Sequence, residues 1–300
     1  MTVYDQISHN KARTIAIVII FIFLVTGFFY LIGLYVRSPS QYFLIGIIFS
    51  VFSSVGSYFY SDKIVLFTTG AQPANKNNFF DFYTVAENLS IAAGVPMPNL
   101  YVIHDQAPNA FATGRNPQHA VVAATTGLLE KLDRSELEGV IAHELSHVKN
   151  YDILVSTIVA VLVGTVALAS DLIMRNLWFG GLRRDDDNRD NKNPFMMIFV
   201  LVILLLTPII ATLIQLAVSR RREFLADASG ALLTRYPEGL AKALEKISSD
   251  RHVLNRTSTS TAHLFIVNPF KKVKRVTNLF SNLFSTHPPV EERIRILRSM

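Results

Sequence analysis

His143-Glu144-Leu145-Ser146-His147 is the stretch that decides the fold expected of this chain. The residues before it predict a helix that is capped by Asp133 or Ser135 and runs through the whole H-E-x-x-H motif. Residues four positions apart share one face of a helix, so both imidazoles can bind one metal ion. Glu144 lies beside them, where it can take a proton from a water molecule. The motif therefore predicts a metal site with Glu144 as its catalytic base.

Zinc is the metal that suits this site, because two neutral histidines, a carboxylate and one open position are typical of catalytic zinc. The simpler alternative is that His143 and His147 are two surface histidines of an amphipathic helix. An elongated motif with a further glycine and histidine is excluded, because Asn150 and Ile153 occupy those positions. Asp152 follows too soon after the motif to fold back comfortably onto the same ion.

The third metal ligand is expected at Glu223, in the stretch Arg220-Arg221-Arg222-Glu223-Phe224-Leu225-Ala226-Asp227. If this stretch is helical, Glu223 and Asp227 lie on one face. Asp227 can then form a hydrogen bond with a metal-binding histidine. The alternative for Glu223 is an ordinary salt bridge to a neighbouring arginine at headgroup level.

Long apolar stretches surround these polar segments. Only 17% of the residues are charged, against roughly 25% in soluble domains. About 20 apolar residues cross a bilayer, and four stretches of this kind contain no charge except Asp171: residues 14–36, about 40–60, about 153–174 and about 195–218. A soluble globule is therefore excluded, and the absence of cysteine excludes a disulfide scaffold.

These spans divide the chain into two hairpins and one polar domain in two parts. The expected boundaries are 1–61 and 153–218 for the hairpins, and 62–152 and 219–300 for the two parts of the domain. Two hairpins return both parts to one membrane face, so residues near 143 can meet residues near 223. Lys11 and Arg13 before the first span, with Arg220 after the fourth, favour the cytoplasm for this face. The loop 175–193 also carries positive charges and favours the opposite orientation.

The polar domain is expected to be α+β. Short apolar runs predict strands at 99–104, 110–113 and 120–125, and helices are expected at 81–93, 237–248 and 288–300. The segment before the motif is charged, so the metal helix is expected outside the hydrocarbon, close to the bilayer surface. The net charge of +6 fits basic residues beside anionic lipid headgroups, and no nucleic-acid partner is expected, because no basic and aromatic binding module is present.

The chain resembles the M48 family of zinc metallopeptidases, and closely its HtpX-type bacterial membrane proteases. Besides the first hairpin and the H-E-x-x-H motif, the resemblance rests on PNAFATG at 108–114, on Glu223-x-x-x-Asp227 and on THPPVEER at 286–293. It implies an α+β fold: a mainly helical, zincin-like metalloprotease domain with a small β-sheet, plus about four transmembrane helices. It also implies one Zn²⁺ per chain.

The same resemblance implies roles in substrate binding. Asn109, Ala110 and Phe111 would lie beside the cleft. The strand 120–125 would be the sheet edge that pairs with a substrate backbone, through Ala120, Val121, Val122 and Ala123. An ordinary buried strand remains the alternative. His287 and Arg293 match positions that face substrate or the developing oxyanion, although they could equally cap a terminal helix.

The function that the resemblance implies is cleavage of misfolded or damaged membrane proteins at the cytoplasmic face of the bacterial cell membrane, in quality control and the stress response. Its partners would be polypeptide substrates and the lipid bilayer. A second hypothesis is a catalytically silent scaffold that binds zinc and misfolded clients, which has no need of Glu144. A transporter or channel predicts ionisable residues within the spans, and only Asp171 qualifies, at the end of one.

Overall fold

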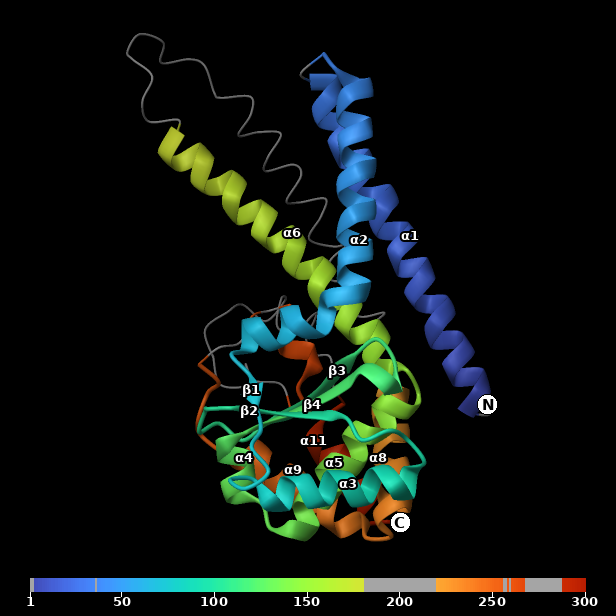
Figure 1. Ribbon diagram of the computed structural model, residues 1–300, viewed down its shortest axis with the longest axis vertical. Helices are drawn as coiled ribbons and strands as arrows, with labels where there is room; N and C mark the ends of the chain where they lie inside the picture. The colour runs from blue at the N-terminus through green and yellow to red at the C-terminus, as the bar shows by residue number, and fades with distance from the viewer. Residues whose placement is uncertain (1–2, 36, 181–219, 256–257, 259, 268–287) are drawn as a thin grey trace.

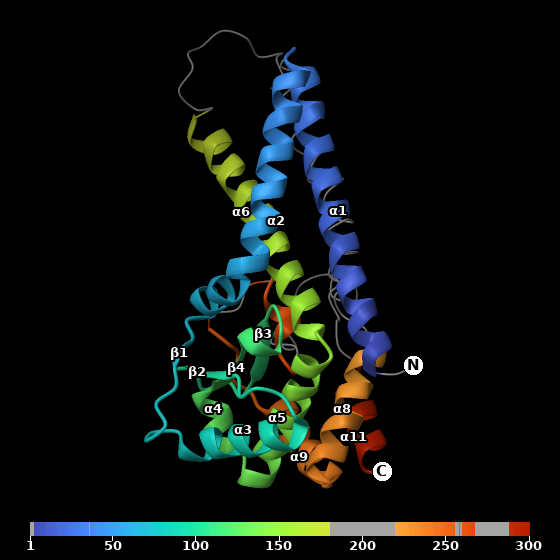
Figure 2. The ribbon, with the colours of Figure 1, turned by 45° about the vertical axis from the view of Figure 1, so that its right-hand side comes forward.

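The computed structural model describes residues 3–35, 37–180, 220–255, 258, 260–267 and 288–300. Three long helices, α1 (Val3–Tyr35), α2 (Pro39–Thr69) and α6 (Asp152–Gly180), project from one side of a compact part (Figure 1). The compact part contains the sheet and the other described helices. The N-terminus of α1 lies at the level of this compact part, beside α8 (Arg220–Thr234), as Figure 2 shows.

Helices α1 and α2 form the expected antiparallel hairpin. Asp5–Leu34 and Pro39–Thr69 are each long and apolar enough to cross a membrane. Apolar side chains such as Phe23 and Phe52 are largely exposed on the outside of the hairpin, as expected of a surface that faces lipid. Small residues on the inner face of α2 let the two helices approach closely, since a Cβ at Gly46 would lie 2.8 Å from the Phe29 Cβ.

The structure describes three of the four expected membrane spans, and two of these differ in detail from the expectation. Helix α2 continues to Thr69, beyond the expected end near residue 60, because its last turns pack Val65 into an apolar cluster with Phe111 of the sheet. The third expected span lies in α6, which meets the preceding helix at 84°. The fourth expected span, 195–218, lies outside the described residues.

A small mixed sheet forms the centre of the compact part. Its strands are β1 (Gln72–Pro73), β2 (Asn99–Ile103), β3 (Ala110–Gly114) and β4 (Ala120–Thr125), in the order β1-β2-β4-β3. Strand β4 pairs parallel with β2 and antiparallel with β3. Every residue of β3 and β4 is buried, because helices cover both faces of the sheet.

The two faces of the sheet have different neighbours. Leu100 and Val122 belong to the cluster formed with α3 (Phe80–Ala93), α5 (Arg134–Lys149), α9 (Pro237–Ser249) and α11 (Val290–Leu297). Phe111 and Ala123 belong to the cluster formed with α6 and the segment that follows the short 3₁₀ helix Ala262–Leu264. Strand β4 is preceded by a 3₁₀ turn, Pro117–His119, and is followed directly by the short helix α4 (Thr126–Lys131). The expectation of a mainly helical fold with a small sheet is confirmed.

Candidate active site

Helix α5 carries the H-E-x-x-H motif and is fixed at its start by a capping box. The Asp133 carboxylate accepts the Glu136 backbone N–H at 3.0 Å, and the Glu136 carboxylate accepts the Asp133 N–H at 2.9 Å. Four residues apart, the imidazoles of His143 and His147 face one another with 3.2 Å between their Nε2 atoms. The motif helix therefore presents two ring nitrogens to a single point.

Helix α8 brings a carboxylate to the same point. It can approach α5 closely because Gly230 has no side chain: a Cβ there would lie 3.1 Å from the His143 backbone nitrogen. Glu223, two turns earlier, places one carboxylate oxygen 3.9 Å from His143 Nε2 and the other 3.5 Å from His147 Nε2. Two segments separated by both α6 and the residues 181–219 thus meet at one site.

These three side chains fit a divalent metal. A tetrahedral zinc ion about 2.0–2.1 Å from each ligand requires ligand atoms about 3.3 Å apart, close to the distances observed. Each Nδ1 faces a carboxylate that only accepts, so the ring hydrogen is assigned to Nδ1. Once the His147 ring is neutral, three groups each offer a lone pair to one point, and a cation satisfies all of them.

A second carboxylate lies behind each histidine. Asp227, one turn after Glu223, places Oδ1 2.9 Å from Nδ1 of His143. Asp152, the first residue of α6, places Oδ2 3.0 Å from Nδ1 of His147. Such partners orient a metal-binding imidazole and raise its basicity.

Asp152 is the site residue that the sequence reasoning missed. Its position in the sequence argues against a role as metal ligand, but its carboxylate contacts Nδ1 of His147 instead. The sharp turn between α5 and α6, with a positive φ of 60° at Tyr151, brings it back. Asn10 of α1 and Arg222 of α8 then hold its Oδ1 at 2.8 and 3.1 Å. The available signal was a carboxylate placed between the motif and an apolar span.

The surroundings of the two histidines shift their pKa values in opposite directions. Burial lowers the pKa of His143, against the opposing effect of Asp227. Burial would also lower the pKa of His147, but the hydrogen bond with Asp152 and the charge of Glu223 raise it to about 9. A metal that binds His147 therefore displaces a proton at neutral pH, and its affinity falls as the pH falls.

Glu144 lies between the metal-site residues and the sheet. It is 2% exposed, and burial raises its pKa to about 7, with a smaller contribution from Glu223. The backbone N–H of Ala112 in β3 lies near its carboxylate and has a small opposing effect on this pKa. A carboxyl group with a pKa near neutrality is suited to accept and return a proton.

Comparison with known proteins identifies the family. Residues 78–300 match the sequence profile described as "Peptidase family M48". The chain belongs to peptidase family M48. Several relatives carry the name "Protease HtpX homolog". That of Tropheryma whipplei (strain Twist) is 48% identical over 297 residues, which cover 99% of this chain and 98% of the relative. That of Dictyoglomus thermophilum is 46% identical and covers 100% of this chain and 95% of the relative.

These relatives place the chain among the HtpX-type members of the M48 family, so the protein is a metallopeptidase. The resemblance expected from the sequence is confirmed. A likeness of fold also extends to the crystal structure of "S. mikatae Ste24p", with a TM-score of 0.51 and 20% identity over 91% of this chain. The chain spans only 62% of the length of that protein, and this likeness concerns the fold alone.

The M48 resemblance implied a substrate-binding edge strand at Ala120–Thr125, and this is wrong. Strand β4 is an inner strand, paired on both sides by β2 and β3. The backbone groups of Ala120, Val121, Val122 and Ala123 are therefore not available to an added strand. The edge beside the motif helix is β3, whose Ala112 lies near Glu144.

The residues expected beside the cleft have structural contacts of their own. Asn109 donates its amide to the Val267 carbonyl at 2.8 Å, and Ile266 donates its N–H to the Ala110 carbonyl at 2.9 Å. Phe111 points to the opposite face of the sheet, edge-on to Phe265 with 5.1 Å between ring centroids. This region thus fastens the segment 265–267 to the start of β3.

Arg293 and His287 were expected at the substrate or at the oxyanion. Arg293 is fully buried behind the metal site and binds both oxygens of Asp227, at 2.8 and 2.6 Å. Burial would raise the pKa of Asp227, but the charge of Arg293 outweighs it and brings this pKa to about 2. The side chain of Arg293 thus supports a histidine partner. His287 lies outside the described residues.

Proposed function

We propose that the chain is a zinc-dependent endopeptidase of the bacterial cytoplasmic membrane that cleaves misfolded or damaged membrane proteins on their cytoplasmic side. The observation that carries this proposal is the convergence of His143, His147 and Glu223 beside the buried carboxyl of Glu144. We assign the first three as zinc ligands and Glu144 as the general base. A scaffold that only binds misfolded clients would not need the carboxyl group of Glu144, with its pKa near neutrality, beside the metal ligands.

The protein groups divide the chemistry between them. When bound, zinc supplies Lewis acidity that lowers the pKa of water and polarises a peptide carbonyl. Glu144 removes the proton from the attacking water and returns it to the departing amine. Asp152 and Asp227 hold the two imidazoles with Nε2 free for the ligand role.

The substrate backbone is proposed to pair with the outer edge of β3, in place of the segment 265–267, whose Ile266 N–H now binds the Ala110 carbonyl. An edge strand binds an extended polypeptide through main-chain hydrogen bonds, which do not read side chains. Ala112 of this strand lies near Glu144, so a peptide paired here passes the base. Broad sequence tolerance, as removal of damaged proteins requires, follows from this mode of binding.

Removal of the metal tests the proposed reaction. Chelation of the purified full-length protein in detergent is expected to reduce casein cleavage by at least about 100-fold, because the ligand set has no other means of polarising the carbonyl. One equivalent of zinc should restore it, with one zinc per chain by elemental analysis. Cleavage that persists after chelation contradicts the zinc assignment, and a zinc-loaded protein that never cleaves supports the scaffold.

The cytoplasmic orientation has its own test. The N-terminal end of α1 lies beside the compact part (Figure 2), and this end of the sequence carries Lys11 and Arg13, which favours the cytoplasm. The chain contains no cysteine, so single-cysteine variants report sidedness without background. A membrane-impermeant maleimide should label Arg37→Cys in spheroplasts and Arg251→Cys only after lysis. The reverse pattern contradicts the orientation.

A further inference from the structure

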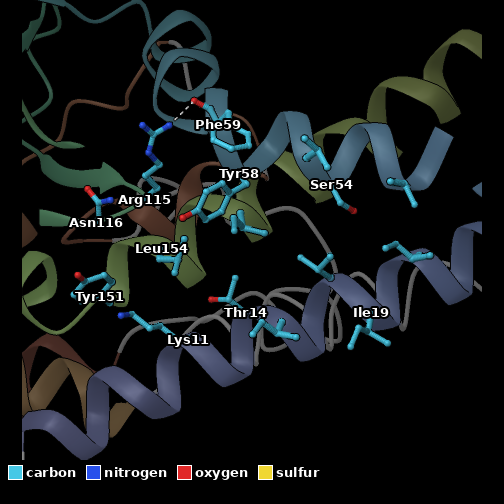
Figure 3. Close-up of a pocket in the computed structure, with 16 residues that line it drawn as sticks. Lys11, Thr14, Ile19, Ser54, Tyr58, Phe59, Arg115, Asn116, Tyr151 and Leu154 are labelled. Atoms are coloured by element: carbon cyan, nitrogen blue, oxygen red, sulfur yellow. Dashed lines mark hydrogen bonds between the residues drawn. The ribbon is translucent and has the colours of Figure 1, made fainter. Parts of the chain in front are cut away.

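A cavity of about 650 Å³ lies between α1, α2 and the start of α6 (Figure 3). This volume lies within the range of about 300–1,000 Å³ found for small-molecule sites. Most of its wall is apolar and comes from all three helices, including Ile15, Ile19 and Ile22 of α1, Val51 and Val55 of α2, and Leu154 of α6. None of these residues belongs to the metal site.

The cavity occupies the depth of one membrane leaflet. Its wall on α1 runs from Lys11 to Ile22, which corresponds to about 16 Å of helix at 1.5 Å per residue. One leaflet contributes about 15 Å of hydrocarbon. Ile15 and Ile19 are 61% and 60% exposed, so the wall is open to the surrounding lipid rather than sealed within the protein.

The end nearest the compact part is cationic. Figure 3 shows Lys11, Arg115, Asn116 and Tyr151 together at this end, with Ser54 and Ile19 toward the other. The Lys11 ammonium lies 4.6 Å from the centre of the Tyr151 ring. The Arg115 guanidinium lies 5.4 Å from the centre of the Phe59 ring and donates to the Phe59 carbonyl at 3.4 Å.

These two cations have no acidic partner in the part of the chain that the structure describes. Among the described residues, the wall of the cavity includes no aspartate or glutamate, and neither Lys11 nor Arg115 forms a salt bridge. An apolar slot of leaflet depth with two cations at its mouth that lack an acidic partner among the described residues is complementary to an acyl chain that ends in an anionic headgroup.

A transmembrane segment of a substrate fits this cavity less well. A typical transmembrane helix, about 10 Å wide, brings no negative charge to pair with Lys11 and Arg115. A peptide helix also satisfies its own backbone and has no need of two cations. We propose that the cavity binds an anionic phospholipid from the leaflet on the side of the compact part, with one acyl chain between α1 and α2 and the phosphate between Lys11 and Arg115.

Native mass spectrometry of the full-length protein in detergent tests this site. The first dioleoyl-phosphatidylglycerol is expected to bind more tightly than the first dioleoyl-phosphatidylcholine. In the double variant Lys11→Gln/Arg115→Gln, phosphatidylglycerol should bind roughly 25-fold more weakly, because each cation near an anionic group contributes about fivefold. The matched control, Lys63→Gln/Lys76→Gln, removes two positive charges outside the cavity and should retain the preference.

A second variant separates the acyl slot from the cations. Ile19→Trp fills the cavity from an exposed position and should weaken the binding of both lipids, whatever their headgroup. Equal affinity for the two lipids in the unmutated protein overturns the proposal. A preference that survives Lys11→Gln/Arg115→Gln, or a polypeptide found in the cavity in place of lipid, overturns it as well.

Discussion

Glu144→Gln is expected to lower peptide hydrolysis by roughly 10²- to 10⁴-fold while the protein still binds one zinc ion. Glutamine keeps the size of the side chain but accepts no proton, so the transfer from water to the leaving amine is lost. His143, His147 and Glu223 are unchanged, and the metal affinity should remain close to that of the unmutated protein. Casein cleavage and elemental analysis on the same sample measure both quantities.

The matched control for this variant is Glu138→Gln, on the same helix. The carboxylate of Glu138 is partly exposed and pairs with Arg134 at 3.4 Å, so its removal should leave cleavage within about twofold of the unmutated protein. A Glu144→Gln protein that cleaves at the rate of this control contradicts the assignment of the base. Loss of cleavage together with loss of zinc would instead assign Glu144 a role in holding the metal.

The motif helix and its third ligand could be predicted because several independent signals agree on them. The spacing of His143 and His147 requires a helix, and the capping box at Asp133 confirms where that helix begins. Glu223 could be placed near them because it follows the fourth expected span directly, on the same membrane face and close to the bilayer surface where the motif helix is expected. The structure brings these side chains within 4.8 Å of one another.

The order of the strands could not be predicted for a physical reason. Strands β3 and β4 are buried on both faces, so each is a continuous apolar run with no alternation. Such a run does not distinguish an inner strand from an edge strand. The position of β4 between β2 and β3 depends on a parallel pairing with Asn99–Ile103, which no local pattern encodes.

Asp152 and Arg293 were misjudged because their roles depend on distant partners. Asp152 reaches His147 through a left-handed turn at Tyr151, a conformation that is uncommon for tyrosine and has no sequence signal. Arg293 lies in a charged helix that reads as exposed. It is buried only because Asp227 and the Ile266 carbonyl, from two other segments, bind its guanidinium.

Arg293→Met is expected to destabilise the compact part by about 3–5 kcal/mol, because it leaves the buried carboxylate of Asp227 without its charge partner. Arg293 is fully buried and its guanidinium lies 3.8 Å from Glu223 as well, so the loss affects two carboxylates of the site. At about 2–4 °C per kcal/mol for a domain of this size, the apparent Tm should fall by about 6–20 °C. Thermal unfolding of the detergent-solubilised protein, scanned at one fixed rate, measures it.

Two further variants separate the loss of the charge pair from a simple packing defect. Arg298→Met removes a guanidinium of the same C-terminal segment that pairs with Glu238 and Glu245 at the surface, and it should leave the Tm nearly unchanged. Adding Asp227→Asn to Arg293→Met removes the uncompensated charge and should recover part of the lost stability, although a cavity would remain. An Arg293→Met protein with the same Tm as Arg298→Met would contradict a stabilising role of the buried pair. So would a double variant, Arg293→Met/Asp227→Asn, with a lower Tm than Arg293→Met alone.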